Sequence, residues 1–156
     1  MSRSGPMHML IDGHNVIHQD ALLRPLAAEI ERAHGELEQL LAERSRITVF
    51  YDGGPGGNTH TLRRHGLTID YSGASEADDR IVRWLLFNPN VRALVVTDDR
   101  GLAGRVRTLG ARILPVRGFL DAFRSQRAAT STDRQPLTPA EVEEWMRIFG
   151  LEDEAH

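Results

Sequence analysis

Short apolar runs alternate with longer amphipathic segments along most of this chain. The runs that match buried strands are 8–11, 47–51, 67–71, 93–97 and 111–115. Between them, apolar residues recur at three- and four-residue steps, as in helices that bury one side. These helical segments are 25–44, 75–87, 99–109 and one that starts within 119–124. Strands and helices alternating at this spacing predict a three-layer α/β/α fold, whose central sheet is mostly parallel and has about five strands.

Two segments lack either pattern and are expected to be loops. One follows the first strand and carries His14 and Asn15, and the other is the glycine-rich GGPGGN of 53–58. Glycine adopts backbone angles that other residues avoid, so the second loop is expected to be flexible.

The end of the chain has a different character. Residues 126–137 are mostly polar and predict a linker. Thr138, Pro139 and Glu141 then form a typical helix start, followed by an apolar side made of Val142, Trp145, Met146 and Phe149. The predicted organisation is therefore one domain at 7–125, a linker at 126–137 and a C-terminal amphipathic helix at 138–150.

Composition narrows the possible functions. The 156 residues include no cysteine, which excludes disulfides, thiolate zinc sites and cysteine nucleophiles. No P-loop, GxGxxG, HExxH or GxSxG motif is present. No apolar run reaches the roughly 20 residues that cross a bilayer, and the first residues do not resemble a secretory signal. We expect a cytoplasmic protein without a membrane partner.

Acidic side chains stand where three of the predicted strands end. Asp12 follows MLI, Asp52 follows TVFY, and Asp98 and Asp99 follow VVT, while Asp78 lies at the start of a helix. Parallel strands carry their ligand site at the carboxyl edge of the sheet, so these carboxylates are expected to meet there. Gathered carboxylates repel one another unless a hard cation such as Mg²⁺ joins them. The pattern predicts a metal-dependent enzyme that acts on phosphate esters.

Each candidate also has an ordinary structural explanation. Asp12, Asn15 and Asp52 are common turn residues, and either Asp98 or Asp99 could cap the next helix. Asp78 sits in a possible capping box that starts at Ser75. Helical geometry places Asp78 nearest the buried side, so we rank it above Asp79 and Glu76 as a site residue. Of the two acids after the fourth predicted strand, we rank Asp99 above Asp98. The spare acid of the 98–99 pair is expected to face the crevice.

The basic residues give a second clue. All 19 are arginines, and several lie near the acidic clusters: Arg63, Arg64, Arg80, Arg83, Arg100, Arg105 and Arg107. Arginine binds phosphate through two parallel hydrogen bonds, so a metal pocket rimmed by arginines would suit a polyanion. The alternative is that they lie on solvated helix faces, which the net charge of −3 does not decide.

Taken in order, the motifs LIDGHN, FYDGG, SEADDRI and VVTDDRG resemble those of the YacP-like NYN domains, a branch of the PIN-like ribonucleases. The resemblance covers about 8–124 and leaves the C-terminal extension outside. It implies a PIN-like fold and a pocket that binds Mg²⁺ or Mn²⁺ and hydrolyses RNA. Because this group includes a ribosome-associated messenger-RNA endonuclease, RNA is the implied partner and the ribosome a further one.

Position by position, the resemblance implies that Asp12, Asn15, Asp78 and Asp99 are catalytic and that Asp52 lines the pocket. Asp79 and Asp98 are reserve metal ligands. The candidate substrate contacts are His14, Arg63, Arg64, Arg80 and Arg100. Two positions depart from the family pattern: His14 stands where the family often has Tyr, and Gly101 stands where a further acid is expected.

Three hypotheses follow. The first is metal-assisted endonucleolytic hydrolysis of single-stranded RNA. The second is an RNA- or ribosome-binding module without catalysis, which the missing acid at Gly101 favours. The third is a small-molecule phosphohydrolase on a similar scaffold. The choice of RNA over DNA and the number of metal ions stay open.

Overall fold

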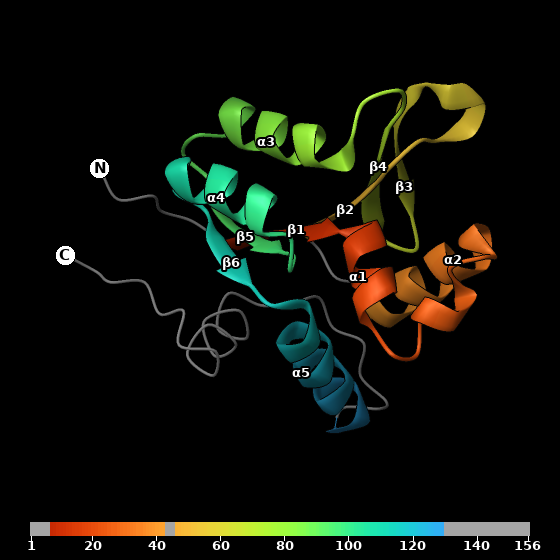
Figure 1. The fold of residues 1–156 in the computed structure, drawn as a ribbon. Coiled ribbons are helices and arrows are strands. Elements are labelled where there is room, and N and C mark those ends of the chain that lie inside the picture. Colours follow the sequence, from red (N-terminus) through yellow and green to blue (C-terminus); the bar gives the residue numbers. More distant parts are fainter. Residues whose placement is uncertain (1–6, 43–45, 130–156) are drawn as a thin grey trace.

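The computed structural model describes residues 7–42 and 46–129, and the polypeptide in this part forms a six-stranded sheet between two helical layers (Figure 1). The strands are β1 (Met7–Asp12), β2 (Ile47–Tyr51), β3 (Thr59–Arg64), β4 (Leu67–Ser72), β5 (Arg92–Val96) and β6 (Arg112–Leu114). Their order is β3-β4-β2-β1-β5-β6, and only β3 runs antiparallel to its neighbour. The predicted three-layer, mostly parallel α/β fold is confirmed.

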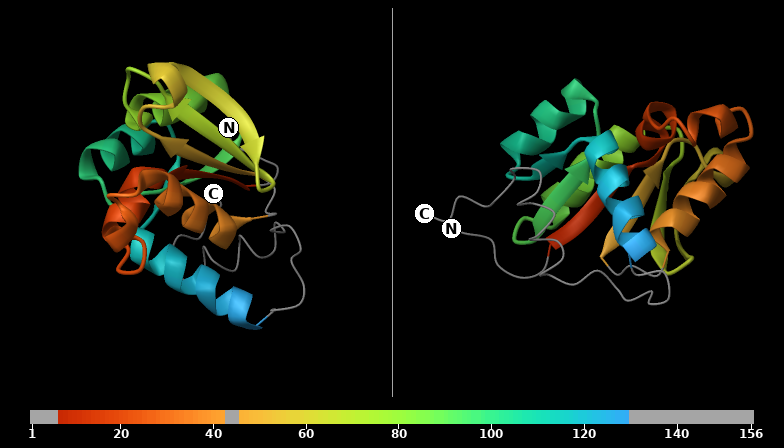
Figure 2. Two further views of the ribbon diagram at one scale, coloured as in Figure 1. Left: turned by 90° about the vertical axis from the view of Figure 1, so that its right-hand side faces the viewer. Right: turned by 90° about the horizontal axis from the view of Figure 1, so that it is seen from below.

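The helices divide between the two faces of the sheet. In the described part of the chain the α-helices are α1 (Gly13–Gln19), α2 (Ile30–Leu41), α3 (Ala77–Phe87), α4 (Arg100–Thr108) and α5 (Val116–Ala129). One buried cluster joins the sheet to α1, α2 and α5, and the other joins it to α3 and α4. Figure 2 shows the layers from two further directions, with α2 and α5 on the same face of the sheet.

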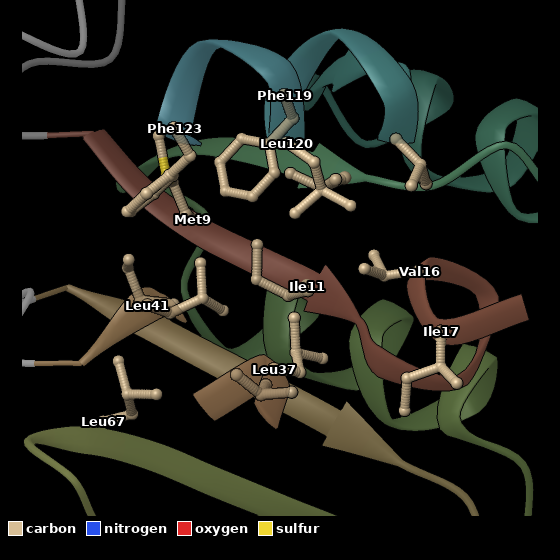
Figure 3. Packing of buried hydrophobic residues seen from close by; sticks show 14 of the residues in the cluster. Met9, Ile11, Val16, Ile17, Leu37, Leu41, Leu67, Phe119, Leu120 and Phe123 are labelled. Atoms are coloured by element: carbon tan, nitrogen blue, oxygen red, sulfur yellow. The ribbon is translucent and has the colours of Figure 1, made fainter. Parts of the chain in front are cut away.

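Strand β1 lies at the centre of the sheet and is buried on both faces. Met9 and Ile11 point into the cluster with α2 and α5, whereas Leu10 points into the cluster with α3 and α4. Figure 3 shows the first of these clusters, where side chains from both helices pack around Met9 and Ile11 on one face of the strand. A strand buried on both faces needs a continuous apolar run rather than an alternating one, which is why MLI precedes the polar Asp12.

Strands β3 and β4 form an antiparallel hairpin, of which only β4 was predicted, as the strand at 67–71. Strand β3 pairs with β4, and the two-residue turn between them has positive φ at His65 (54°) and Gly66 (77°), as a tight hairpin turn requires. The glycine-rich stretch forms a short 3₁₀ turn, η2 (Pro55–Gly57). Strand β3 was missed because an edge strand with mostly exposed residues needs no apolar alternation.

Several helix bounds also differ from the prediction. Helix α1 begins directly after Asp12, so His14 and Asn15 lie in a helix and not in a loop. The segment predicted as one helix at 25–44 is a 3₁₀ turn, η1 (Arg24–Leu26), followed by the shorter α2. Helix α3 begins at Ala77 with Glu76 as its N-cap residue, and Ser75 instead bonds to Ser72. The capping box therefore does not form.

The carboxyl end of the described chain is helical for longer than expected. Helix α5 begins at Val116, because Asp98 binds its first backbone N–H, and it continues to Ala129. The first four residues of the predicted linker 126–137 are thus part of α5. The predicted C-terminal helix at 138–150 lies outside the described residues. Within 7–42 and 46–129, no helix is long and apolar enough to span a membrane.

Candidate active site

The carboxyl ends of the three central parallel strands bring the polar residues together. Ile11 lies between Val49 of β2 and Val96 of β5, so the residues that follow these strands emerge side by side. Because side chains alternate along a strand, Asp12 faces the layer of α3 and α4 while Ile11 faces the opposite layer. Parallel sheets bind their ligands at the carboxyl edge, and in this protein that edge is lined by acidic side chains and by Thr97.

Asp12 is the most deeply buried carboxylate of this group, with 5% of its surface exposed. Its Oδ2 accepts a hydrogen bond of 3.0 Å from Thr97 Oγ1. Burial raises the pKa of Asp12 to about 7, and the negative charges of Asp78, Asp52 and Asp99 add to the effect. A carboxylate in this state gains stability from a bound cation or proton.

Thr97 connects Asp12 with the loop after β5. Its hydroxyl oxygen accepts from the backbone N–H of Asp99 at 3.0 Å, while its single proton is directed to Asp12. Asn15 Oδ1 accepts from the backbone N–H of Asp98 at 2.8 Å and lies 3.4 Å from Thr97 Oγ1. These bonds hold the start of α1 against the end of β5.

Asp98 and Asp99 each bind the start of a different helix. Asp99 is the N-cap of α4, and its Oδ1 accepts from the backbone N–H of Leu102 at 3.1 Å. Asp98 Oδ1 accepts from the backbone N–H of Val116 at 3.0 Å, at the first residue of α5. We expected one cap and one acid free to face the crevice. The alternation of successive residues sends the two side chains to opposite layers, so both are caps.

Asp52 joins α1 to α3. Its Oδ1 accepts from the backbone N–H of Ala77 at 2.7 Å, and its Oδ2 lies 3.2 Å from His14 Nδ1. The hydrogen bond from His14 lowers the pKa of Asp52, and the bond from Ala77 acts in the same direction. Asp52 is therefore the ionised neighbour that makes ionisation of Asp12 harder.

The two acids that open α3 have different surroundings. Burial raises the pKa of Asp78, and the charges of Asp99, Glu76 and Asp52 raise it further. Asp79 instead pairs with Arg105 of α4 at 3.1 Å on the surface. The charge of Asp78 thus interacts with those of Asp12, Asp52 and Asp99, whereas Asp79 is paired with an arginine outside this group.

The donor chemistry of this group fits a hard divalent cation. Burial raises the pKa of Asp12 and Asp78, and the negative charges of Asp52 and Asp99 raise both further, which is the repulsion that such an ion relieves. In the part of the chain that the structure describes, no three acidic or histidine side chains are placed to ligate one ion directly. Mg²⁺ commonly keeps several waters and takes only one or two protein carboxylates, so the donor set still suits it.

A comparison with protein families identifies the fold. The model of the YacP-like NYN domain matches residues 9–147. This chain belongs to the YacP-like NYN domain family. The matched region extends well beyond residue 124, where we expected the resemblance to end, and it includes most of the segment predicted as a C-terminal helix. Membership gives the chain a ribonuclease-like fold and places it in a family of nuclease type.

Two solved structures from Bacillus subtilis share the fold of this NYN domain. The crystal structure of Rae1 (YacP) has a TM-score of 0.67 and 21% identity, over 90% of this chain and 82% of that one. The structure of its W164L mutant has a TM-score of 0.64 and 23% identity, over 92% of each chain. No curated protein matches the sequence significantly.

The arginines predicted to bind substrate in this NYN domain occupy two regions. Arg63 and Arg64 lie at the end of β3 beside the first residues of β4, which is the amino edge of the parallel strands. Arg63 donates to Thr68 Oγ1 and to the carbonyl of Gly66. These two arginines lie away from the acidic group at the carboxyl edge, because β3 carries the chain back to the amino edge of the sheet.

The guanidinium groups of Arg64 and Arg80 bind acidic side chains. Arg64 donates to both oxygens of buried Glu38, at 2.6 and 2.9 Å. Arg80 makes a similar pair with Asp70 of β4, at 2.8 and 2.9 Å. Arg100 is exposed at the first position of α4, directly after Asp99. Of the four, Arg100 has the position expected of a contact to a bound phosphate.

Two site residues were not predicted from the sequence. Thr97 follows the apolar VV of β5, and a hydroxyl at the end of a buried strand could have indicated its role. His34 lies on α2, and its Nε2 is 3.0 Å from His14 Nε2. Burial lowers the pKa of His34 to about 4, so the ring is neutral at physiological pH. No sequence signal marked His34, because its partner comes from another helix.

Proposed function

We propose that this protein is a divalent-metal-dependent endoribonuclease that hydrolyses phosphodiester bonds in single-stranded RNA. Messenger RNA on the ribosome is the proposed substrate, and the cytoplasm is the proposed location. The observation that carries the proposal is the gathering of Asp12, Asp52, Asp78 and Asp99 at one sheet edge, where the pKa of Asp12 rises to about 7. That edge belongs to a fold of the nuclease type.

Asp12, Asp78 and Asp99 would hold Mg²⁺ or Mn²⁺, in part through coordinated water molecules. When bound, such an ion lowers the pKa of a coordinated water and neutralises charge on a phosphate. Thr97 holds the carboxylate of Asp12, and the backbone N–H of Leu102 holds that of Asp99. Asn15 braces the loop that carries Asp98 and Asp99.

The remaining residues of the site position RNA and the helices around it. Arg100 is exposed beside Asp99 and would contact a phosphate that flanks the scissile bond. Asp52 keeps the start of α3 in place, and Asp78 with it. An acidic protein needs such local positive charge because its net charge of −3 does not attract RNA.

A second candidate function is an RNA- or ribosome-binding module without catalysis. It is favoured by Gly101, which stands where the family pattern has a further acid. Such a module would bind RNA equally well with EDTA and would leave the RNA intact.

The test is cleavage of labelled single-stranded RNA by wild type, Asp12→Asn and Asp121→Asn, with Mn²⁺ or Mg²⁺ and with EDTA. Asp121 is an exposed acid of α5 and supplies the matched control. We expect cleavage by wild type and by the control with metal, and none by Asp12→Asn or with EDTA. Cleavage by Asp12→Asn would remove that residue from the mechanism, and binding without cleavage by folded wild type would establish the second candidate.

A further inference from the structure

A chain of hydrogen-bonding groups runs from the interior of α2 to the start of α3. His34 of α2 faces His14 of α1, with 3.0 Å between their Nε2 atoms. His14 Nδ1 lies 3.2 Å from Asp52 Oδ2, and Asp52 Oδ1 accepts from the backbone N–H of Ala77 at 2.7 Å. Three helices and the loop after β2 therefore meet through one line of contacts, which ends at Ala77 beside Asp78.

The protons in this chain can be placed by counting donors and acceptors. An ionised carboxylate only accepts, so His14 Nδ1 carries the proton that is donated to Asp52. The two Nε2 atoms are 3.0 Å apart, a hydrogen-bond distance, so one of them carries a proton and the other accepts it. With one proton on each ring, His34 Nε2–H donates to the bare Nε2 of His14. Both nitrogens of His14 are then engaged within the protein and cannot bind RNA in this arrangement.

The surroundings of His34 fix its ring. It stacks on Tyr51 with ring centroids 3.6 Å apart and planes inclined by 9°. The Tyr51 hydroxyl donates to Glu38 Oε2 at 2.8 Å, and Arg64 binds both oxygens of Glu38. Only 8% of His34 is exposed. A packed ring with so little freedom can impose an orientation on its partner.

We propose that His34 is a positioning residue of this site: it fixes His14 in the tautomer that carries the proton on Nδ1, and His14 in turn orients the Asp52 carboxylate. Because Asp52 holds the first residue of α3, this chain sets where Asp78 lies relative to Asp12. The consequence for metal binding and RNA cleavage rests on the proposed function. The tautomer of His14 does not depend on it.

The first experiment measures that tautomer by long-range ¹⁵N–¹H NMR on protein with ¹⁵N-labelled histidine. Three variants are compared with wild type. His34→Phe keeps a ring on Tyr51 but has no N–H, whereas His34→Gln keeps an N–H donor. His18→Phe is the matched control, because His18 is exposed on α1.

Wild type and the control should show a protonated Nδ1 and a bare Nε2 at His14. His34→Phe should lose this signature, and His34→Gln should restore it. The inference is overturned if wild type carries the proton on Nε2 of His14, or if His34→Phe retains the wild-type signature. Because the first of these outcomes needs wild type alone, a variant that fails to fold does not prevent the test.

The second experiment measures Mn²⁺ affinity by calorimetry, together with RNA cleavage. Outer hydrogen-bond partners of metal sites typically contribute 10–100-fold in affinity, so His34→Phe should bind Mn²⁺ about tenfold more weakly, with recovery in His34→Gln. Equal affinity and cleavage in wild type and His34→Phe would overturn the inference while leaving the nuclease intact. If wild type neither binds Mn²⁺ nor cleaves RNA, the proposed function fails, and the NMR result alone decides the role of His34.

Discussion

Thr97 Oγ1 donates a hydrogen bond of 3.0 Å to Asp12 Oδ2, and both side chains are buried. The bond joins the ends of β1 and β5, which are neighbours in the sheet although 85 positions separate the two residues in sequence. The same hydroxyl oxygen accepts from the backbone N–H of Asp99. One small side chain therefore sets the position of two of the proposed metal ligands.

Replacing Thr97 by Val removes the hydroxyl and keeps the shape of the side chain. Asp12 then loses a bond that lowers its pKa, so the pKa should rise above the wild-type value. Leaving the buried carboxylate and the Asp99 N–H without a partner should cost about 1–3 kcal/mol in the free energy of unfolding. Carboxyl ¹³C NMR and urea denaturation measure the two effects.

Thr97→Ser retains the hydroxyl and is the control for this change. It should keep the pKa of Asp12 and most of the RNA cleavage, whereas Thr97→Val should lower cleavage by about tenfold. If the valine and serine variants cleave RNA equally well, the hydroxyl does not position the site.

Asp12→Asn should stabilise the metal-free protein in a pH-dependent manner. The pKa of Asp12 is raised from 3.8 to about 7, so between these values the folded state binds a proton that the unfolded state has released. The free energy of unfolding of wild type therefore falls as the pH rises through this window. Asp12→Asn has no such group and keeps its stability as the pH rises. Its free energy of unfolding should therefore exceed that of wild type by almost nothing at pH 4 and by at most about 4 kcal/mol above pH 7.

Urea denaturation in EDTA at several pH values checks this expectation. Asp121→Asn, at an exposed position, should follow the wild-type curve throughout. An advantage of Asp12→Asn that is the same at pH 4 and pH 8 would show that the carboxylate is not held with a raised pKa.

The strand ends were predictable from the sequence, and the contacts between elements were not. Asp12 and Asp52 could be placed at strand ends because a carboxylate directly after an apolar run is poorly explained by packing. The pairing of Arg64 with Glu38 was not found, because their positions depend on a hairpin whose exposed strand has no apolar pattern. A polar contact between distant segments leaves no periodic signal in either of them.

Gly13→Ala should destabilise the protein and disturb the site. A Cβ atom at this position would lie 2.5 Å from the ring of Tyr51 and 2.9 Å from the carbonyl oxygen of Phe50. The backbone oxygen belongs to the sheet and cannot move aside cheaply, so α1 must shift and carry His14 away from Asp52. Overpacking of this kind costs about 1–3 kcal/mol, which thermal or urea denaturation would detect.

Gly35→Ala is the matched change on α2, since no atom lies within 4 Å of the added Cβ. Alanine is favoured over glycine inside a helix, so this variant should gain about 0.5–1 kcal/mol. A gain in stability for both variants would mean that α1 does not pack on Tyr51 as described.

Arg64→Met should destabilise the fold without a specific effect on RNA. Glu38 is 1% exposed on its side chain, and Arg64 is its bidentate partner. Removing the guanidinium leaves a buried carboxylate with the Tyr51 hydroxyl and a distant His65, at 3.9 Å, as its contacts. Breaking a buried ion pair from one side costs about 3–5 kcal/mol.

Arg63→Met is the control on the same strand. The hydrogen bonds of Arg63 lie at the surface, so removing its guanidinium should lower the free energy of unfolding by no more than about 1 kcal/mol. Adding Glu38→Gln to Arg64→Met should recover part of the lost stability, since the uncompensated charge is then removed. RNA affinity measured on the folded fraction should be the same for wild type and both single arginine variants. A loss of RNA affinity in Arg64→Met at unchanged stability would instead make Arg64 a substrate contact, as the sequence alone suggested, and would place RNA on both edges of the sheet.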